Sequence, residues 1–175
     1  MKVKSAPKSG GLAVAESAHI SPAQAENPGG KPAVRCILVA TDFSAASLRA
    51  LEYALRLGGP CAARLILLHV HEPAGFGTEY LALPAQRDEQ FESNLRTARE
   101  RLSQLEGRHV GHRVPCETLV RVGRAWSEIP ETAAALGADL IVLGARGEGP
   151  ANGWRTGSTV EGVVRHARCP VVIVP

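Results

Sequence analysis

The stretch from residue 141 to residue 158 decides the fold, and it reads IVLGARGEGPANGWRTGS. The apolar run that opens it stops at Gly144, a second glycine follows at Gly147, and Gly157 and Ser158 begin a new helical pattern. This order predicts a buried strand, a glycine loop and a helix. Glycines let the backbone approach a bound molecule closely, and the first turn of a helix carries N–H groups without helical partners. We expect the place to suit phosphate oxygens, because amide dipoles and the positive end of a helix converge on it.

The chain of 175 residues has the length of one ordinary domain preceded by a tail. Residues 1–32 are rich in Gly, Pro, Ser and Ala and show no sustained period, which predicts a flexible tail, and residues 33–175 then form the domain. All lysines of the chain lie in this tail with two glutamates, so the tail carries +2 of the net charge of +3 and leaves +1 for the domain. A nearly neutral domain gives no electrostatic reason to expect nucleic-acid binding.

The spacing of the cysteines and the hydropathy of the chain indicate in which cellular compartment the protein is expected. The cysteines form no CxxC pair, so we interpret them as buried thiols in a reducing compartment; they are Cys36, Cys61, Cys116 and Cys169. No apolar run has the length of a membrane span, and the N-terminus lacks the hydrophobic segment of a secretory signal. We therefore expect a cytoplasmic protein that does not enter a membrane.

Strand and helix patterns alternate along the domain. Short apolar runs predict strands at 34–40, 64–70, 117–122, 139–143 and 171–174. Helical periods predict helices from the N-cap Ser44 to Gly58, from about 84 to 106, and over 158–167. Between the last two, a further helix is expected that contains Pro130 and whose inner face is formed by Trp126, Ile129, Ala133 and Leu136. A long irregular loop is expected over 72–84. This alternation predicts a doubly wound α/β fold, an open sheet of five parallel strands with helices on both faces.

Ligands of such sheets bind beyond the carboxyl ends of the strands, where the strand order reverses. The first strand ends near Asp42, the second near Val70 and the fourth at Gly144, so these ends would form one crevice. Simpler interpretations stay open: Asp42 as a turn residue, the glycines as an ordinary turn, and Arg146 as an exposed loop residue instead of a phosphate clamp. His69 and His71 share a strand face, but no third metal ligand accompanies them, which favours structural histidines.

With these residues assembled, residues 34–175 resemble the universal stress protein family, in particular its ATP-binding branch. That branch has the motif G-x2-G-x9-G-[ST], which Gly144, Gly147, Gly157 and Ser158 match in spacing. The resemblance extends through TDFS after the first strand, LLHV in the second, ADLIVLG in the fourth and the closing VVRHARCPVVIV. One departure is the polar segment 148–156, where the family usually has apolar residues just before the third glycine.

The resemblance implies a Rossmann-like domain that binds ATP, with Mg²⁺ or Mn²⁺ held through the phosphates. It further implies a homodimer in which residues 171–174 pair with their copy, and a role as a sensor or regulator in the stress response. The residues implied to contact the nucleotide are Ala40, Thr41 and Asp42 at the adenosine, the backbone of Val70 at the adenine edge, Gly144, Arg146 and Gly147 at the ribose and phosphates, and Gly157, Ser158 and Thr159 at the phosphate end.

Several enzyme classes are excluded by composition. A Walker phosphate loop needs a lysine that this domain lacks, and the G-x-S-x-G nucleophile motif is absent. No nucleophile, base and orienting partner assemble from the sequence, so we interpret the domain as an adenine-nucleotide-binding module without assigned catalytic or metal-ligating residues. Two alternatives stay open: a slow ATPase or phosphotransfer enzyme, and a dimeric interaction module that holds no nucleotide.

Overall fold

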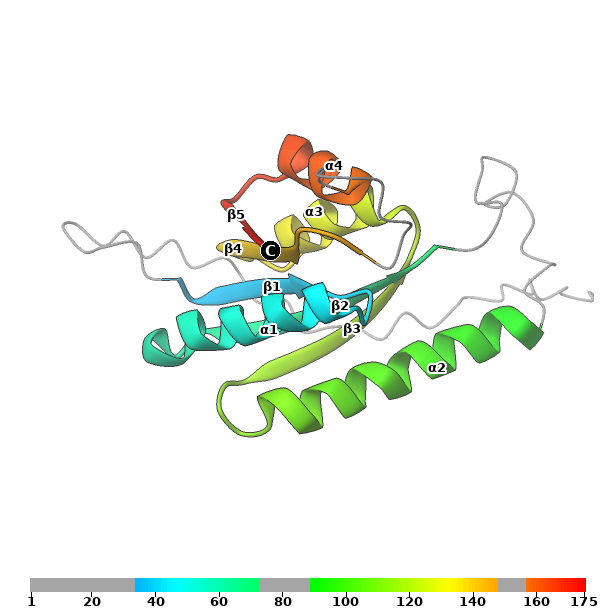
Figure 1. Cartoon of the computed structure of the whole chain (residues 1–175), viewed down its shortest axis with the longest axis horizontal. Helices are drawn as coiled ribbons and strands as arrows, with labels where there is room; N and C mark the ends of the chain where they lie inside the picture. Colours follow the sequence, from blue (N-terminus) through cyan, green and yellow to red (C-terminus); the bar gives the residue numbers. More distant parts are fainter. Residues whose placement is uncertain (1–33, 73–88, 148–156) are drawn as a thin grey trace, which may run out of the picture.

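A computed structural model of the chain describes residues 34–72, 89–147 and 157–175 (Figure 1). The predicted tail, nearly all of the predicted irregular loop, the first residues of the predicted second helix and the polar segment 148–156 lie outside the described residues.

Within the described residues the strands are β1 (Cys36–Ala40), β2 (Arg64–His71), β3 (Cys116–Val122), β4 (Leu140–Gly144) and β5 (Val171–Val174). The α-helices are α1 (Ala45–Gly58), α2 (Glu89–Leu105), α3 (Ala125–Ala135) and α4 (Ser158–His166). Two short helical turns, η1 (Gly59–Cys61) and η3 (Glu106–Val110), follow α1 and α2. None of the helices in these ranges is long and apolar enough to cross a membrane.

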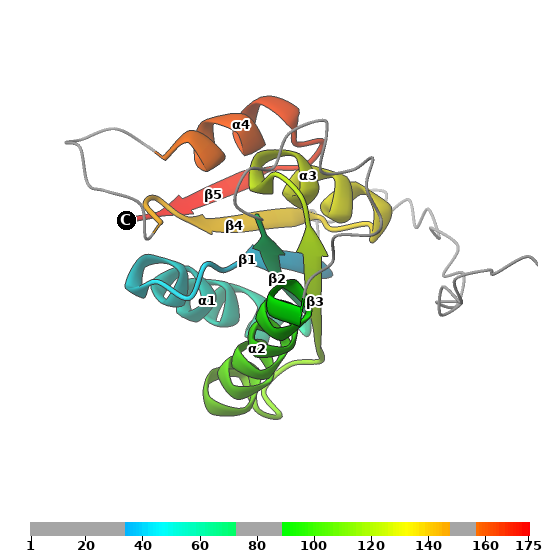
Figure 2. The same ribbon diagram turned by 90° about the vertical axis from the view of Figure 1, so that its right-hand side faces the viewer.

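All five strands pair in parallel, in the order β3-β2-β1-β4-β5. The chain builds the sheet from β1 outward to β3, then returns to the other side of β1 to add β4 and β5. The strand order therefore reverses between β1 and β4. Figure 2 shows α1 and α2 covering one face of the sheet and α3 and α4 covering the other. The predicted doubly wound α/β fold is confirmed.

The core divides into two layers because successive strand residues point to opposite faces. On the α1 and α2 side, Ile37, Val39, Leu65, Leu67 and Val142 pack against Leu51, Leu55 and Leu102. On the α3 and α4 side, Leu38, Ile66, Leu68, Ile141 and Leu143 pack against Ile129, Ala133, Val160 and Val163. The strands β1 and β4 are apolar on both faces for this reason, as expected for a parallel sheet covered on both sides, whereas the edge strand β3 carries the polar residues Glu117 and Arg121.

The start of α1 agrees with the prediction from its sequence. Ser44 is the N-cap, and its hydroxyl accepts a hydrogen bond of 3.2 Å from the backbone N–H of Ser47. The helix ends at Gly58 and passes directly into the η1 turn, which contains Pro60. At the other end, the first turn of α1 lies against β4 at Gly144. A β-carbon at Gly144 would come to 2.8 Å from the carbonyl carbon of Ala46, so only glycine allows this approach.

Three of the sequence predictions need correction or comment. Trp126, expected on the inner face of α3, is 41% exposed, because the helix turns Ile129 and Ala133 to the sheet while Trp126 lies over Gly162 of α4. Of the four cysteines expected to be buried thiols, only Cys36 is buried; Cys116 and Cys169 are half-buried, and Cys61 is exposed in η1. Pro130 does lie inside α3, as predicted, and being without an N–H it leaves one helical hydrogen bond unmade.

Candidate functional site

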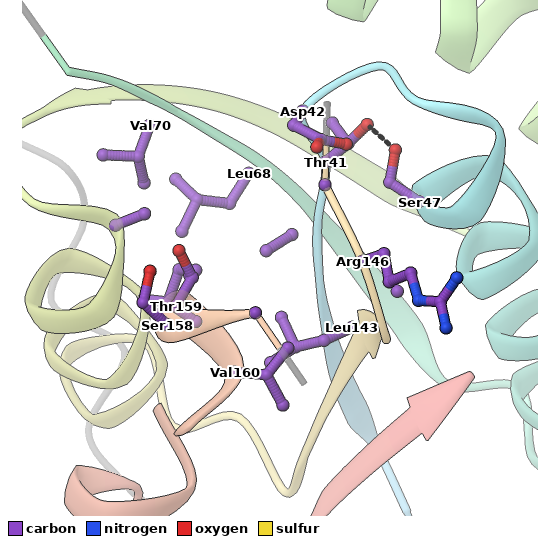
Figure 3. A pocket seen from close by; sticks show the side chains of 16 residues that line it. Thr41, Asp42, Ser47, Leu68, Val70, Leu143, Arg146, Ser158, Thr159 and Val160 are labelled. Carbon is purple, nitrogen blue, oxygen red and sulfur yellow. Dashed lines mark hydrogen bonds between the residues drawn. The ribbon is translucent and has the colours of Figure 1, made fainter. Parts of the chain in front are cut away.

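A pocket of about 250 Å³ lies at the carboxyl ends of the strands, where β1 and β4 adjoin (Figure 3). All ten residues singled out from the sequence line it: Ala40, Thr41, Asp42, Val70, Gly144, Arg146, Gly147, Gly157, Ser158 and Thr159. The fold thus brings together the three strand ends that were expected to meet. That these residues bind a nucleotide stays a prediction.

Six further residues line the pocket and were missed by sequence reasoning: Ser47, Leu68, Ala125, Ile129, Leu143 and Val160. Most are apolar, and Figure 3 shows Leu68, Val70, Leu143 and Val160 surrounding the hollow. These four side chains belong to the core layer that lies between the sheet and the helices α3 and α4, and the pocket is at the edge of this layer. The period-two pattern of strands could have indicated Leu68, because it shares a face with Val70 in β2.

The turn between β1 and α1 forms the polar edge of the pocket. Thr41 is buried, and its hydroxyl lies 3.0 Å from the hydroxyl of Ser47 and accepts a 3.0 Å hydrogen bond from the N–H of Phe43. Asp42 Oδ1 accepts a 3.1 Å hydrogen bond from the N–H of Ser44. Asp42 therefore stabilises the turn and also lines the pocket, so the two interpretations left open for it are compatible.

Behind this turn lies His69 of β2. Its Nδ1 is 2.9 Å from the carbonyl oxygen of Thr41, and since a carbonyl only accepts, Nδ1 carries the hydrogen. Burial lowers the pKa of His69 below its ordinary value of 6.5, and this effect outweighs the hydrogen bond to Thr41, which raises the pKa. The neutral ring thus donates to the backbone of the turn. Within the described ranges, no three His, Cys, Asp or Glu side chains are placed to hold a metal ion together.

The start of α4 faces the pocket from the opposite side. Gly157 is its N-cap, and the N–H of Glu161 donates to the carbonyl of Gly157, so the N–H groups of Ser158 and Thr159 precede the first helical hydrogen bond. In the first turns of α1 and α3, backbone N–H groups donate hydrogen bonds to side chains. Ser44 caps α1, and Glu72 Oε1 accepts a 2.6 Å hydrogen bond from the N–H of Ala125 in α3.

Of the described residues that line the pocket, Asp42 and Arg146 carry charged side chains. Arg146 is exposed, and Figure 3 shows its guanidinium on the α1 side, turned away from Ser158 and Thr159. Its position therefore agrees with the exposed-loop interpretation better than with a phosphate clamp in this arrangement. The pocket combines an apolar wall, a carboxylate and main-chain N–H groups, which suit a flat ring, a hydroxyl group and an anion respectively.

Comparison with known proteins gives the family of the chain. The model of the universal stress protein family matches residues 34–175. A protein of Thermus aquaticus, named as a universal stress protein in the 3′ region of the QAH/OAS sulfhydrylase, is 34% identical over 142 residues, covering 80% of this chain and 98% of that protein. The stretch matched by the family model includes the residues that line the pocket.

Solved structures share the fold. The universal stress protein UspA of Lactobacillus plantarum is 27% identical with a TM-score of 0.66, covering 83% of this chain and all of that one. A universal stress protein in complex with cAMP has the same fold; it is 24% identical with a TM-score of 0.61, covering 81% of this chain and 97% of that one. A universal stress protein from Archaeoglobus fulgidus in complex with dAMP also has this fold; it is 20% identical with a TM-score of 0.59, covering 82% of this chain and 99% of that one. With the family match over residues 34–175 and the relative in Thermus aquaticus, this chain belongs to the universal stress protein family.

Proposed function

We propose that the domain binds an adenine nucleotide, specifically ATP with Mg²⁺ or Mn²⁺ on its phosphates, and acts in the cytoplasm as a sensor or regulator of a stress response. One observation carries the proposal: ten residues from four separate stretches of the sequence line a single pocket at the carboxyl ends of the strands. Family membership supports it, and two proteins of the same fold were solved with cAMP and dAMP, which are both adenine nucleotides.

The adenine would lie against the apolar wall. Leu68 and Val70 of β2 and Ile129 of α3 line this part of the pocket, and an apolar surface stabilises a flat ring through burial and dispersion. Hydrogen bonds from the backbone near Val70 would then distinguish adenine from other bases. The carboxylate of Asp42 is suited to accept hydrogen bonds from ribose hydroxyls.

The phosphates would lie at the start of α4. The N–H groups of Ser158 and Thr159 and their hydroxyls are donors there, and the helix dipole favours an anion. Amides replace the lysine that other phosphate loops use, since every lysine of this chain lies in residues 1–32. A divalent cation fits only in part: among the described residues that line the pocket Asp42 is the one acidic residue, so phosphate oxygens would provide most of the ligands of the cation.

The proposal includes a homodimer that forms through β5. This strand is at one edge of the sheet, and Ile173 within it is 40% exposed. An edge strand offers unpaired backbone groups to a second strand, and pairing with a copy satisfies them. In this arrangement residues 33–175 form the binding unit, and residues 1–32 form a tail outside it.

Binding is tested by native mass spectrometry of the purified protein and by titration calorimetry with ATP and Mg²⁺. We expect a dissociation constant well below about 1 mM, which corresponds to about −4 kcal/mol. The proposal is contradicted if the purified protein retains no adenine nucleotide and ATP binds no more tightly than about 1 mM.

The variant Gly157→Val tests the placement of the phosphates. A β-carbon at Gly157 would meet no protein atom within 4 Å, and its φ of −61° suits any residue, so the fold should tolerate valine. We expect weaker ATP binding with unchanged unfolding. The matched control is Gly107→Val, whose β-carbon also meets nothing and which lies in η3, outside the pocket.

Phosphate release from ATP above background that Asp42→Ala abolishes would favour the ATPase alternative.

A further inference from the structure

We propose that Arg101 of α2 and His69 of β2 are positioning residues for the pocket, and that both act through the ring of Phe43. None of these three residues lines the pocket. Together they would hold the turn that presents Thr41 and Asp42 to the ligand. The inference rests on the proposed function in one respect, which is that the ligand of the pocket is an adenine nucleotide.

Phe43 has an uncommon backbone conformation. Its φ is +68°, in the left-handed region, where the β-carbon of a bulky residue crowds the following carbonyl group. This conformation costs about 1–2 kcal/mol in a residue other than glycine, so surrounding contacts must compensate for it. The reversal at Phe43 is what lets the chain leave β1, pass through Thr41 and Asp42, and enter α1.

Two side chains hold the ring of Phe43. The ring centroids of Phe43 and His69 are 4.6 Å apart at an interplanar angle of 36°. The Cζ of Arg101 lies over the ring of Phe43, 4.1 Å from its centroid, which is a cation–π geometry. The ring also packs against the core layer that contains Leu102, the neighbour of Arg101 in α2.

His69 fixes the same turn a second time, through the backbone. Its Nδ1–H donates to the carbonyl of Thr41, while the N–H of Thr41 donates to the carbonyl of Leu68 at 2.8 Å. The peptide groups on both sides of Thr41 are therefore bonded to β2. One imidazole ring thus supports the turn both by stacking on Phe43 and by hydrogen bonding to Thr41.

Arg101 is supported by a firmly packed part of α2. Leu102 is 1% exposed and Ala98 is 5% exposed, so this part of the helix is anchored in the core. Arg101 itself is exposed and extends from this anchor to Phe43. The helix, which makes no contribution to the pocket lining, would influence binding through this one side chain. By thermodynamic reciprocity, a ligand in the pocket should also stabilise the contact between Arg101 and Phe43.

The first test measures the affinity for Mg²⁺-ATP by calorimetry in Arg101→Met, which keeps the length of the side chain but removes its charge. A cation–π contact at an exposed site contributes about 0.5–1 kcal/mol, so we expect affinity to fall about two- to fivefold. Arg101→Lys keeps a cation and should restore most of the loss. The matched control is Arg99→Met, an exposed arginine on the same helix, which should bind as the wild type does.

A double-mutant cycle separates positioning from general destabilisation. If Arg101 acts through the ring, then Arg101→Met should change the affinity little in a background of Phe43→Leu, because leucine has no aromatic face. His69→Leu removes both the stacking and the hydrogen bond and should weaken binding more than Arg101→Met. Additive effects of Arg101→Met and Phe43→Leu, or equal affinities in Arg101→Met and Arg99→Met, would overturn the inference while leaving the proposed function intact.

A ligand-free measurement decides the inference even if the wild type binds no nucleotide. The amide signals of Thr41 and Asp42 and the ring nitrogens of His69 can be followed by NMR in the free protein. We expect Arg101→Met to shift these signals, Arg101→Lys to return them toward wild-type positions, and Arg99→Met to leave them unchanged. Unshifted signals in Arg101→Met would overturn the positioning role. Absent nucleotide binding with shifted signals would instead count against the proposed function alone.

Discussion

The carboxylate of Asp42 lies directly against the backbone of Gly147. A β-carbon built on Gly147 would come to 2.6 Å from Asp42 Oδ2, closer than side-chain atoms approach one another. Asp42 follows β1 and Gly147 follows β4, so this contact joins the two loops on either side of the point where the strand order reverses. The surface of the pocket is continuous across the two loops because no side chain intervenes at Gly147.

We expect Gly147→Ala to weaken nucleotide binding more than it weakens the fold. The added methyl group must displace the carboxylate of Asp42, and the loss of one hydrogen bond to the ligand corresponds to about five- to tenfold in affinity. The displaced atom is the end of a side chain, so stability should change by less than about 1 kcal/mol. Calorimetry with Mg²⁺-ATP and urea unfolding measure the two effects. Unchanged affinity would show that Asp42 does not contact the ligand.

Gly144→Ala should have the opposite profile and mainly destabilise the fold. Its β-carbon would meet backbone atoms, at 2.8 Å for Ala46 C and 2.9 Å for Ser47 N, which cannot move without shifting α1. Overpacking of this kind costs about 1–3 kcal/mol. Urea unfolding should show a lower midpoint than in Gly107→Ala, where the new methyl group meets nothing. Equal midpoints in the two variants would contradict close packing of α1 on β4.

His69 should make the stability of the fold sensitive to acid. Burial lowers its pKa in the folded state below the ordinary value of 6.5, so the unfolded state binds the proton more readily. The charges that face it are Arg101 of α2 and His71 of β2, which oppose protonation, and Asp42 of the turn, which favours it. The contribution of His69 to stability is therefore fully present above pH 6.5 and is lost as the pH falls from 6.5 through the folded-state pKa.

The measurement compares free energies of unfolding at about pH 7.5 and about pH 5 in the wild type and in His69→Gln. We expect a smaller loss on acidification in the variant, because glutamine does not titrate. His112→Gln, which replaces an exposed histidine, should behave as the wild type does. The same acid loss in all three proteins would show that His69 does not contribute to it.

Ile173→Lys should prevent dimer formation through β5. The substitution places a charge on the exposed side of an edge strand, where a second copy would have to desolvate it. The control is Val122→Lys, which alters a 37% exposed valine in β3 at the opposite edge of the sheet. Sedimentation should find Ile173→Lys monomeric and Val122→Lys dimeric. A dimer in both variants would place the interface elsewhere.

Much of this architecture could be predicted because its determinants are local in the sequence. The strands are short, apolar and bounded by turns, and Ser44 before a leucine period marks the start of α1. The meeting of three strand ends in one pocket could be predicted from the same information, since parallel strands necessarily bring their carboxyl ends to one edge, whereas the full set of contact residues was implied by the family resemblance. Neither prediction required knowledge of how side chains pack.

The features that escaped prediction depend on contacts between distant elements. Trp126 has the spacing of an inward residue, but the period of one helix cannot reveal that Gly162 of another leaves room for it outside the sheet. Ile129 and Val160 reach the pocket because α3 and α4 converge above it, which no single segment encodes. The positive φ of Phe43 was not anticipated either, because its compensating partners lie in β2 and α2.

The pairing between β1 and β4 has a mechanical consequence. It joins a block of β1, β2 and β3 to a block of β4 and β5 over only three residue pairs, Ile37 with Leu140, Leu38 with Ile141 and Val39 with Val142. A ligand bound across the β1–β4 pairing would contact both blocks and hold them together. Pulling the domain apart in a force experiment should therefore require more force when the pocket is occupied, and the extra resistance should appear at the separation of the blocks.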